Sequence, residues 1–104
     1  MSSSVIEIQE ARARSARVDD EALTVDLADG RTMIVPLVWF PRLWHGTAVE
    51  RNRLELFGDG SYIHWPDLDE DLAVVDLVAG RRSGESAQSL RRWLARRERR
   101  RRPR

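Results

Sequence analysis

The sequence predicts an α+β fold: a small antiparallel sheet made of three strands, a helical connection and a two-strand hairpin, followed by a C-terminal amphipathic helix. Two glycine-containing turns each separate two apolar runs, which is the pattern of β-hairpins. The apolar spacing changes to that of a helix after residue 40 and again after residue 86. The chain has 104 residues, which is enough for one domain with a small core.

The expected strands are separated by turn residues. Asp29 and Gly30 fit a two-residue turn, because glycine adopts the positive φ that such turns need, and residues 58–60 (Gly-Asp-Gly) form the second turn. Pro36 has no N–H to donate to a neighbouring strand, so the third strand either lies at an edge there or ends there. The five expected strands are one that ends near Val18 and those at residues 22–28, 31–39, 54–57 and 61–65.

The connection between the third and fourth strands is expected to be helical. Pro41 suits the first turn of a helix, and Leu43 and Trp44 should face the body of the domain. Thr47 and Glu50 have the spacing of a capping box, in which each side chain bonds to the backbone N–H of the other residue. This pattern predicts a short helix that ends at about residue 53.

A run of five residues that begins at Asp67 contains four acids. A calcium loop starting there would need glycine at its sixth position and glutamate at its twelfth, and the sequence has Leu72 and Val78 instead. Carboxylates this close in sequence also do not face each other across a substrate. We expect Asp67 to cap a helix that runs through residues 72–80, although the β-branched pair at 74–75 is also compatible with a short strand.

The clearest helical pattern lies near the C-terminus. Leu90, Trp93 and Leu94 form one apolar stripe surrounded by arginine, and Ser86 is placed to cap the helix. After residue 95 the sequence has no apolar face and Pro103 interrupts it, so we expect this arginine-rich tail to be disordered. The expected organisation is a domain at residues 1–80, a linker at 81–85, an amphipathic helix of the same domain at 86–95 and the tail at 96–104.

Charge is distributed unevenly along the chain. All 18 basic residues are arginine; residues 1–84 carry 9 of them against 15 acids, a balance of −6, whereas residues 85–104 carry 9 against 2, a balance of +7. The basic segment can therefore bind the acidic body or be offered to a partner. There is no cysteine, and no apolar stretch is long enough for a signal peptide or a spanning helix, so we expect a cytoplasmic protein without a membrane partner.

The sequence offers little for catalysis. The two histidines, His45 and His64, lack a recognisable acid–base partner, and neither belongs to a cluster with metal-ligand spacing. We expect His64 to be a half-buried packing residue on a strand and His45 to lie on the surface. No glycine-rich phosphate loop and no Gly-x-Ser-x-Gly motif is present. We therefore expect no catalytic residue, no metal, no cofactor and no enzymatic activity.

Three segments together resemble a known family: 29-DGRTMIVPLVWFPRL-43, 60-GSYIHWPDLDEDLAV-74 and 83-SGESAQSLRRWL-94. They resemble the DUF2442 family of small bacterial proteins, over about residues 15–94. The resemblance implies a compact α+β domain with a small antiparallel sheet and carries no established enzymatic activity. It also implies a partner, because family members are often encoded beside a small DUF4160 protein in a pairing proposed as a toxin–antitoxin module. Some relatives add a helix-turn-helix domain, for which this chain has no room after residue 94.

Two functional hypotheses follow, and they belong to different classes. Large aromatic residues and arginine are enriched at binding hot spots, and we expect Trp39 and Trp65 to be used in the core. The first hypothesis is a non-enzymatic protein-interaction module, in its specific form an antitoxin that masks a small DUF4160-type partner, with self-association also open. Its candidate contact residues are Trp44, Leu90, Trp93 and Leu94. The alternative is a nucleic-acid-binding accessory protein that uses Arg91, Arg92, Arg96, Arg97, Arg99, Arg100, Arg101 and Arg102.

Overall fold

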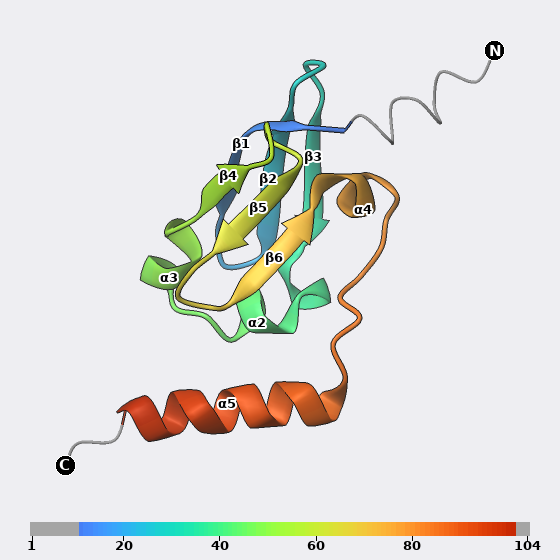
Figure 1. Cartoon of the computed structure of the whole chain (residues 1–104). Coiled ribbons are helices and arrows are strands. Elements are labelled where there is room, and N and C mark those ends of the chain that lie inside the picture. The colour runs from blue at the N-terminus through green and yellow to red at the C-terminus, as the bar shows by residue number, and fades with distance from the viewer. Residues whose placement is uncertain (1–10, 102–104) are drawn as a thin grey trace.

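The computed structural model of the chain describes residues 11–101 and has two antiparallel three-stranded sheets that pack face to face with the core between them (Figure 1). The first sheet contains β1 (Ala13–Val18), β2 (Ala22–Leu27) and β3 (Thr32–Pro36), and the second contains β4 (Glu55–Phe57), β5 (Tyr62–Trp65) and β6 (Glu70–Ala73). The helices are η1 (Leu37–Trp39), α2 (Pro41–Trp44), α3 (Ala48–Asn52), α4 (Val74–Val78) and α5 (Ala87–Arg101). The predicted α+β class is confirmed, with two small sheets in place of one.

The first sheet follows the apolar alternation of the sequence. Leu23, Val25 and Leu27 on β2 are buried, and Val25 pairs with Met33 across to β3. Gly30 has φ +98° in the turn between β2 and β3, as expected for the Asp-Gly pair. The third strand ends at Pro36, three residues earlier than the expected range of 31–39, because the chain turns there into the 3₁₀ helix η1.

The helical connection contains the expected capping box. The Thr47 side chain accepts a hydrogen bond from the Glu50 N–H at 3.1 Å, and the Glu50 carboxylate accepts one from the Thr47 N–H at 2.9 Å. Pro41 begins α2, and Leu43 is fully buried. The orientation expected for Trp44 is wrong, because this side chain is 45% exposed at the end of α2.

Arg51 on α3 closes the end of α2 from inside the fold. Its Nε donates to the Leu43 carbonyl at 2.8 Å, which also accepts a hydrogen bond from the Gly46 N–H at 3.1 Å. Its Nη2 donates to the Trp44 carbonyl at 2.7 Å, so Arg51 satisfies carbonyl groups at a helix C-terminus. The Arg51 carbonyl in turn accepts a hydrogen bond at 3.0 Å from the indole Nε1 of Trp65, a fully buried residue. The expected core position of Trp65 is therefore confirmed.

The expected helix cap at Asp67 is wrong. The acidic run leads into β6, which pairs with β5. The helix that follows is α4, which is shorter than the helix expected at residues 72–80. Leu68 is fully buried beneath the turn, and Asp69 adopts φ +50°, which a helix would not accept. Pairing of Leu72 with Ile63 places apolar residues of both strands on the core side. The pairing with β5, which is not local in sequence, therefore overrides the local helical signal.

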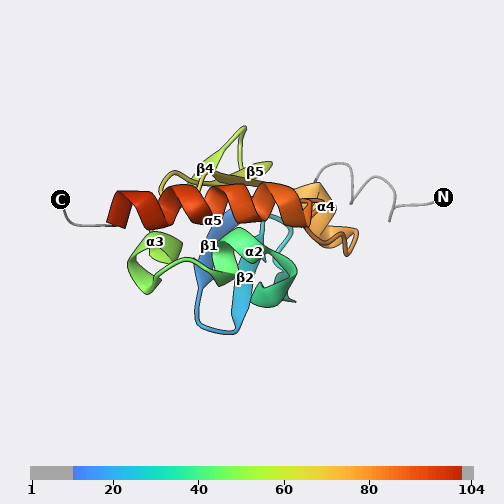
Figure 2. The ribbon, with the colours of Figure 1, turned by 90° about the horizontal axis from the view of Figure 1, so that it is seen from below.

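The C-terminal helix begins as expected and extends further than expected. Ser86 caps it, since its Oγ accepts a hydrogen bond from the Ser89 N–H at 3.1 Å. The helix continues through Arg101 instead of ending at residue 95, and it runs across the end of the two sheets (Figure 2). Arginine has high helix propensity, and three arginines in the last turn interact favourably with the negative end of the helix dipole. Residues 1–10 of the expected domain and 102–104 of the expected tail lie outside the described residues.

None of the helices between residues 11 and 101 combines the length and apolar character needed to cross a bilayer.

Gly60 connects the two sheets at the tip of the second hairpin. Its carbonyl accepts a hydrogen bond from the Ala13 N–H on β1 at 2.7 Å, and its φ is +85°. A Cβ at this position would lie 2.3 Å from the Ala13 carbonyl oxygen, whereas a Cβ at Gly30 would meet nothing within 4 Å. Of these two glycines, only Gly60 combines a left-handed backbone with a close approach of the backbone of another strand.

The substitutions Gly60→Ala and Gly30→Ala separate these two effects. Both introduce a side chain at positive φ, which costs about 1–2 kcal/mol. Gly60→Ala should lower the free energy of unfolding by a further 1–3 kcal/mol or so, because the new methyl group overlaps β1. Urea denaturation of the two variants measures the difference, and equal losses would mean that the two sheets are not in contact at Gly60.

Candidate interaction surfaces

The arginine-rich helix α5 is attached to the body through Trp93, which is 4% exposed. The guanidinium of Arg42 lies 5.2 Å from the centroid of the indole ring, and that of Arg97 lies 4.7 Å from it. Each arginine is also bound by a glutamate, Arg42 by Glu85 and Arg97 by Glu50. We refer to these five residues as the Trp93 clamp. Cation–π contacts of this kind are stronger when they are shielded from solvent, as here.

The first ion pair of the clamp connects α2 to the segment before α5. Arg42 donates to the Glu85 carboxylate from Nε at 2.8 and 3.1 Å and from Nη2 at 2.6 Å, and Nη1 donates to the Asp69 carbonyl at 3.0 Å. Glu85 also accepts a hydrogen bond from Ser89 Oγ at 2.7 Å. The hydrogen bonds from Arg42 hold the pKa of Glu85 below its usual value, so the pair is charged at neutral pH.

The second ion pair connects α5 to the start of α3. Arg97 donates to both carboxylate oxygens of Glu50, at 2.9 and 2.8 Å. Together with the capping bond from Thr47, the bonds from Arg97 lower the pKa of Glu50 to about 2. Glu50 therefore has two tasks, since it caps α3 and fixes the middle of α5. Side-chain exposures of 12% for Arg97 and 19% for Glu50 keep this pair largely out of solvent.

The apolar stripe predicted as a contact surface packs mainly on the chain itself. Trp93 is buried, and Leu90 and Leu94 are partly buried against the core. Of the four candidate protein-contact residues, Trp44 alone is classed as exposed in this conformation.

The predicted arginine set divides into three groups. Arg97 is engaged in the clamp, and Arg102 lies beyond the described part of α5. The others are exposed, and within residues 11–101 none has a carboxylate within 4.0 Å. These six exposed residues are Arg91, Arg92, Arg96, Arg99, Arg100 and Arg101.

Three of the four acids in the run after Pro66 each have a different partner. Arg53 Nη1 donates to both carboxylate oxygens of Asp67 at 3.0 Å. Asp69 lies beside Arg42, with 3.5 Å between charged atoms, and Asp71 bonds to His64 Nδ1. Between residues 11 and 101 no three His, Asp or Glu side chains come together in a way that could hold a metal ion.

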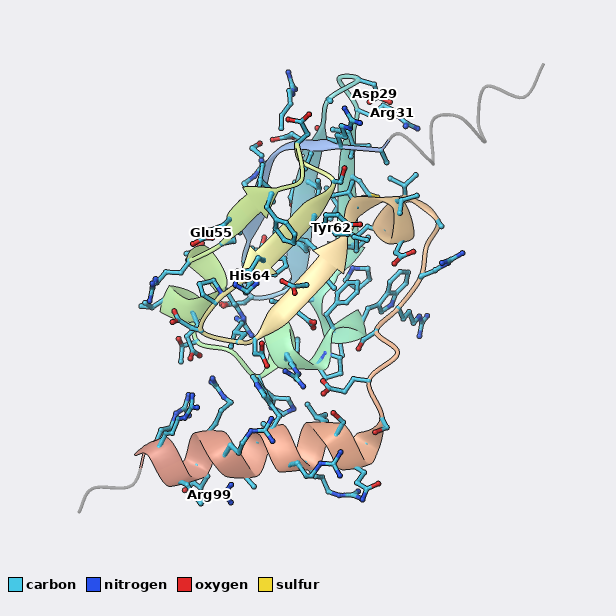
Figure 3. All side chains as sticks on the ribbon, in the orientation of Figure 1. Asp29, Arg31, Glu55, Tyr62, His64 and Arg99 are labelled. Carbon is cyan, nitrogen blue, oxygen red and sulfur yellow. The ribbon has the colours of Figure 1, made fainter. Side chains whose placement is uncertain are left out.

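A surface that the sequence analysis did not identify lies on the outer side of the second sheet. Phe57 on β4 and Tyr62 on β5 are stacked with 5.0 Å between ring centroids, and they are 44% and 43% exposed. The His64 ring meets Phe57 edge-on at 6.3 Å. Glu55 and Asp71 pair with His64 from the two neighbouring strands. Figure 3 shows Glu55, Tyr62 and His64 on the side of the sheet that faces the viewer.

We call these five residues the aromatic face. The signal for it is present in the sequence, because alternation along residues 55–57 and 62–65 places Glu55, Phe57, Tyr62 and His64 on the side opposite the core. His64 is half-buried on this face, and His45 is exposed, as expected for both.

Between residues 11 and 101, Glu70 is the titratable group whose environment is least favourable for its charge. It lies on β6 opposite Trp65, and burial raises its pKa to about 7 despite the nearby Arg42. The neighbouring carboxylates of Glu85 and Asp71 add to this shift. Between pH 4.5 and about 7 an unfolded chain has already released this proton while the folded chain keeps it, so Glu70 makes the fold less stable as the pH rises.

Glu70→Gln should remove this penalty without changing the shape of the side chain. We expect the variant to unfold at nearly the same temperature as the parent protein at pH 4.5 and at a higher temperature at pH 8. Thermal unfolding of both proteins across this range gives the comparison. A variant that is equally stable or less stable at pH 8 would show that Glu70 is well solvated.

Trp93→Ala should release α5 from the body. Loss of a buried tryptophan costs about 3–5 kcal/mol, and the two arginines lose the ring that both contact. We expect trypsin to cleave within residues 91–101 at least about ten times faster than in the parent protein, since cleavage requires local unfolding. Trp44→Ala, at a 45% exposed position, is the matched control. Unchanged cleavage in Trp93→Ala would contradict the packing of this helix on its own chain.

The family model that matches the chain covers the two sheets and the short helices. The family model described as "Protein of unknown function (DUF2442)" matches residues 13–83 and ends before α5. No curated protein matches the chain.

Two solved structures have a similar fold. A crystal structure of a protein of unknown function from Rhodospirillum rubrum is 33% identical, covers 77% of this chain and 98% of its own, and superposes with a TM-score of 0.65. The solution NMR structure of an uncharacterised protein from Chromobacterium violaceum is 21% identical, with 89% and 82% covered and a TM-score of 0.61. Since the family model spans more than half of the sequence, the chain belongs to the DUF2442 family of proteins of unknown function.

Proposed function

We propose that the chain is a non-catalytic protein-interaction module that binds its partner through the aromatic face. The observation that carries this proposal is the stacked pair of Phe57 and Tyr62, two large rings that remain more than 40% exposed on the open side of a sheet. Aromatic residues supply much of the binding energy at protein interfaces. Because stacking already fixes both rings, they lose little conformational entropy on binding.

The charges around these rings favour a basic partner. Glu55 and Asp71 lie on the same face as the rings, and residues 1–84 as a whole carry a balance of −6. A partner that presents arginine or lysine beside an apolar residue could stack its cation on Phe57 or Tyr62 and pair with these carboxylates. Complementary charges of this kind select the partner and speed its association.

The engagement of the titratable side chains supports a binding role over a catalytic one. His64 is bound by Asp71 and packs against Phe57. Asp67 is bound by Arg53, and Asp69 lies beside Arg42, which also holds Glu85 in place. Carboxylates occupied in such pairs are poor general bases, which must be free to exchange a proton with a substrate. A carboxylate at Nδ1 also orients catalytic histidines, so for His64 the binding role rests on the packing of its ring against Phe57.

The specific form of the proposal is an antitoxin that masks the surface of a small DUF4160-type protein. The family resemblance supports this pairing, because such proteins are often encoded beside DUF2442 members. The aromatic face combines exposed aromatic rings with flanking carboxylates, and an interface that masks a partner's surface needs an apolar centre and a polar rim of this kind. Self-association through the same face is the alternative outcome.

The test uses the full chain and a DUF4160-type protein encoded in the same genome. We expect a stoichiometric complex by titration calorimetry, and Tyr62→Glu should weaken it by at least about 30-fold, as for a hot-spot residue. Ile34→Glu is the matched control, because Ile34 is 68% exposed on β3, in the other sheet, and should change the affinity less than about twofold.

Two results would overturn this assignment. Equal effects of the two substitutions would remove the aromatic face from the interface. A homodimer that Tyr62→Glu dissociates, observed by light scattering without any binding of the DUF4160-type protein, would replace the antitoxin by a self-associating module.

A further inference from the structure

We propose that α5 carries a binding track for the phosphates of a nucleic acid, formed by Arg92, Arg96, Arg99 and Arg100. This second surface is separate from the aromatic face and does not depend on the proposed function. Figure 2 shows α5 lying across the end of both sheets, where its length is open to a large ligand. We call these four residues the arginine track.

Helix geometry places the track on one side of α5. At 100° per residue, its four residues fall within about one third of the helix circumference and span about 12 Å along the axis. Trp93 lies on the side that packs against the body. Glu98, the one acid in α5, and Arg91 both lie on the far flank, away from the track. The track is therefore a continuous line of positive charge without an acid on it.

These arginines have no acidic partner in the chain between residues 11 and 101, in contrast to Arg97, which is paired with Glu50. The difference follows from their position on the helix. Arg97 points to the body and stabilises the clamp, whereas the track residues lie beside this contact. Their charges are thus available to an external anion.

A groove of about 500 Å³ between α5 and the turn before β6 borders the track. Arg96, Arg100 and Arg101 line it together with three acids. Glu50 and Asp67 have arginine partners of their own, whereas Asp69 shares Arg42 with Glu85, so one negative charge faces the three arginines. The pairs are Glu50 with Arg97, Asp67 with Arg53 and Asp69 with Arg42. An anion that enters the groove therefore meets an excess of positive charge.

The chemistry of α5 favours a nucleic acid over an acidic protein. Within the described residues, all the large hydrophobic side chains that are strongly exposed lie outside α5, so a protein would find no apolar anchor there. Guanidinium groups bind phosphate oxygens in a bidentate manner, and regularly spaced phosphates suit a regular line of arginines. Contacts to phosphates carry no base information, so we expect binding without sequence specificity.

The Trp93 clamp prepares this surface for binding. It keeps the arginine-bearing helix formed and docked, so that little conformational entropy remains to be lost when a ligand binds. A free arginine-rich peptide would have to order itself at that moment.

The experiment measures binding of the full chain to a fluorescein-labelled 20-nucleotide oligo(dT) by anisotropy at 50, 100 and 200 mM NaCl. Four phosphate contacts predict a slope of log K against log[NaCl] of about −3, and about −3.6 for a 20-base-pair duplex. Arg96→Gln should reduce the steepness of the slope by about 0.7–0.9 and the affinity at 100 mM by roughly 5–8-fold. Arg91→Gln, with the same chemical change on the far flank, should leave the slope unchanged.

Three outcomes would overturn the inference. A slope near zero would exclude phosphate contacts. Equal losses in Arg91→Gln and Arg96→Gln would mean that diffuse charge, and not the track, binds the oligonucleotide. A labelled 20-residue polyglutamate that binds as tightly as oligo(dT), with the same sensitivity to Arg96→Gln, would assign the surface to an acidic protein. Circular dichroism of both variants checks that α5 remains helical.

Discussion

The contact of Trp93 with the guanidinium groups of Arg42 and Arg97 determines how the C-terminal third of this protein is arranged. Each arginine is neutralised by a glutamate, and this allows two cations to lie against one ring without leaving an unpaired buried charge. Removal of any one member leaves its partner poorly solvated, so the five groups act as a unit. Because Glu50 also caps α3, the fold of the body and the position of α5 are coupled.

Much of the sheet structure could be predicted from the sequence, because the decisive signals were local. The Asp-Gly turn before β3 and the capping box of α3 each depend on residues within four positions of one another. The error at β6 has the opposite origin. Residues 70–73 follow an acidic run that resembles a helix start, and only pairing with β5 makes them a strand. The extension of α5 past residue 95 likewise depends partly on Arg97 meeting an acid 47 positions away.

The candidate surfaces were predictable to a different degree. The stripe of Leu90, Trp93 and Leu94 was evident from helical spacing. Periodicity indicates that one face of a helix is buried, but it does not identify the residues that pack against that face. The partners of Trp93 come from α2 and from α5 itself. Only the folded structure therefore shows that this residue packs on its own chain and not on another. Strand alternation indicates which side of the hairpin carries the aromatic face, but its stacked pair depends on the register that sets Phe57 opposite Tyr62.

The two proposed surfaces have opposite charge and lie on different elements, an acidic aromatic sheet face and a basic helix, and the clamp fixes one relative to the other. The central claim is therefore that α5 is bound to its own body. A double-mutant cycle of Glu50→Gln and Arg97→Gln measures this directly, since glutamine at 50 still permits the capping box. We expect a coupling free energy of about 1–3 kcal/mol between the two positions. Additive effects of the two substitutions would contradict it.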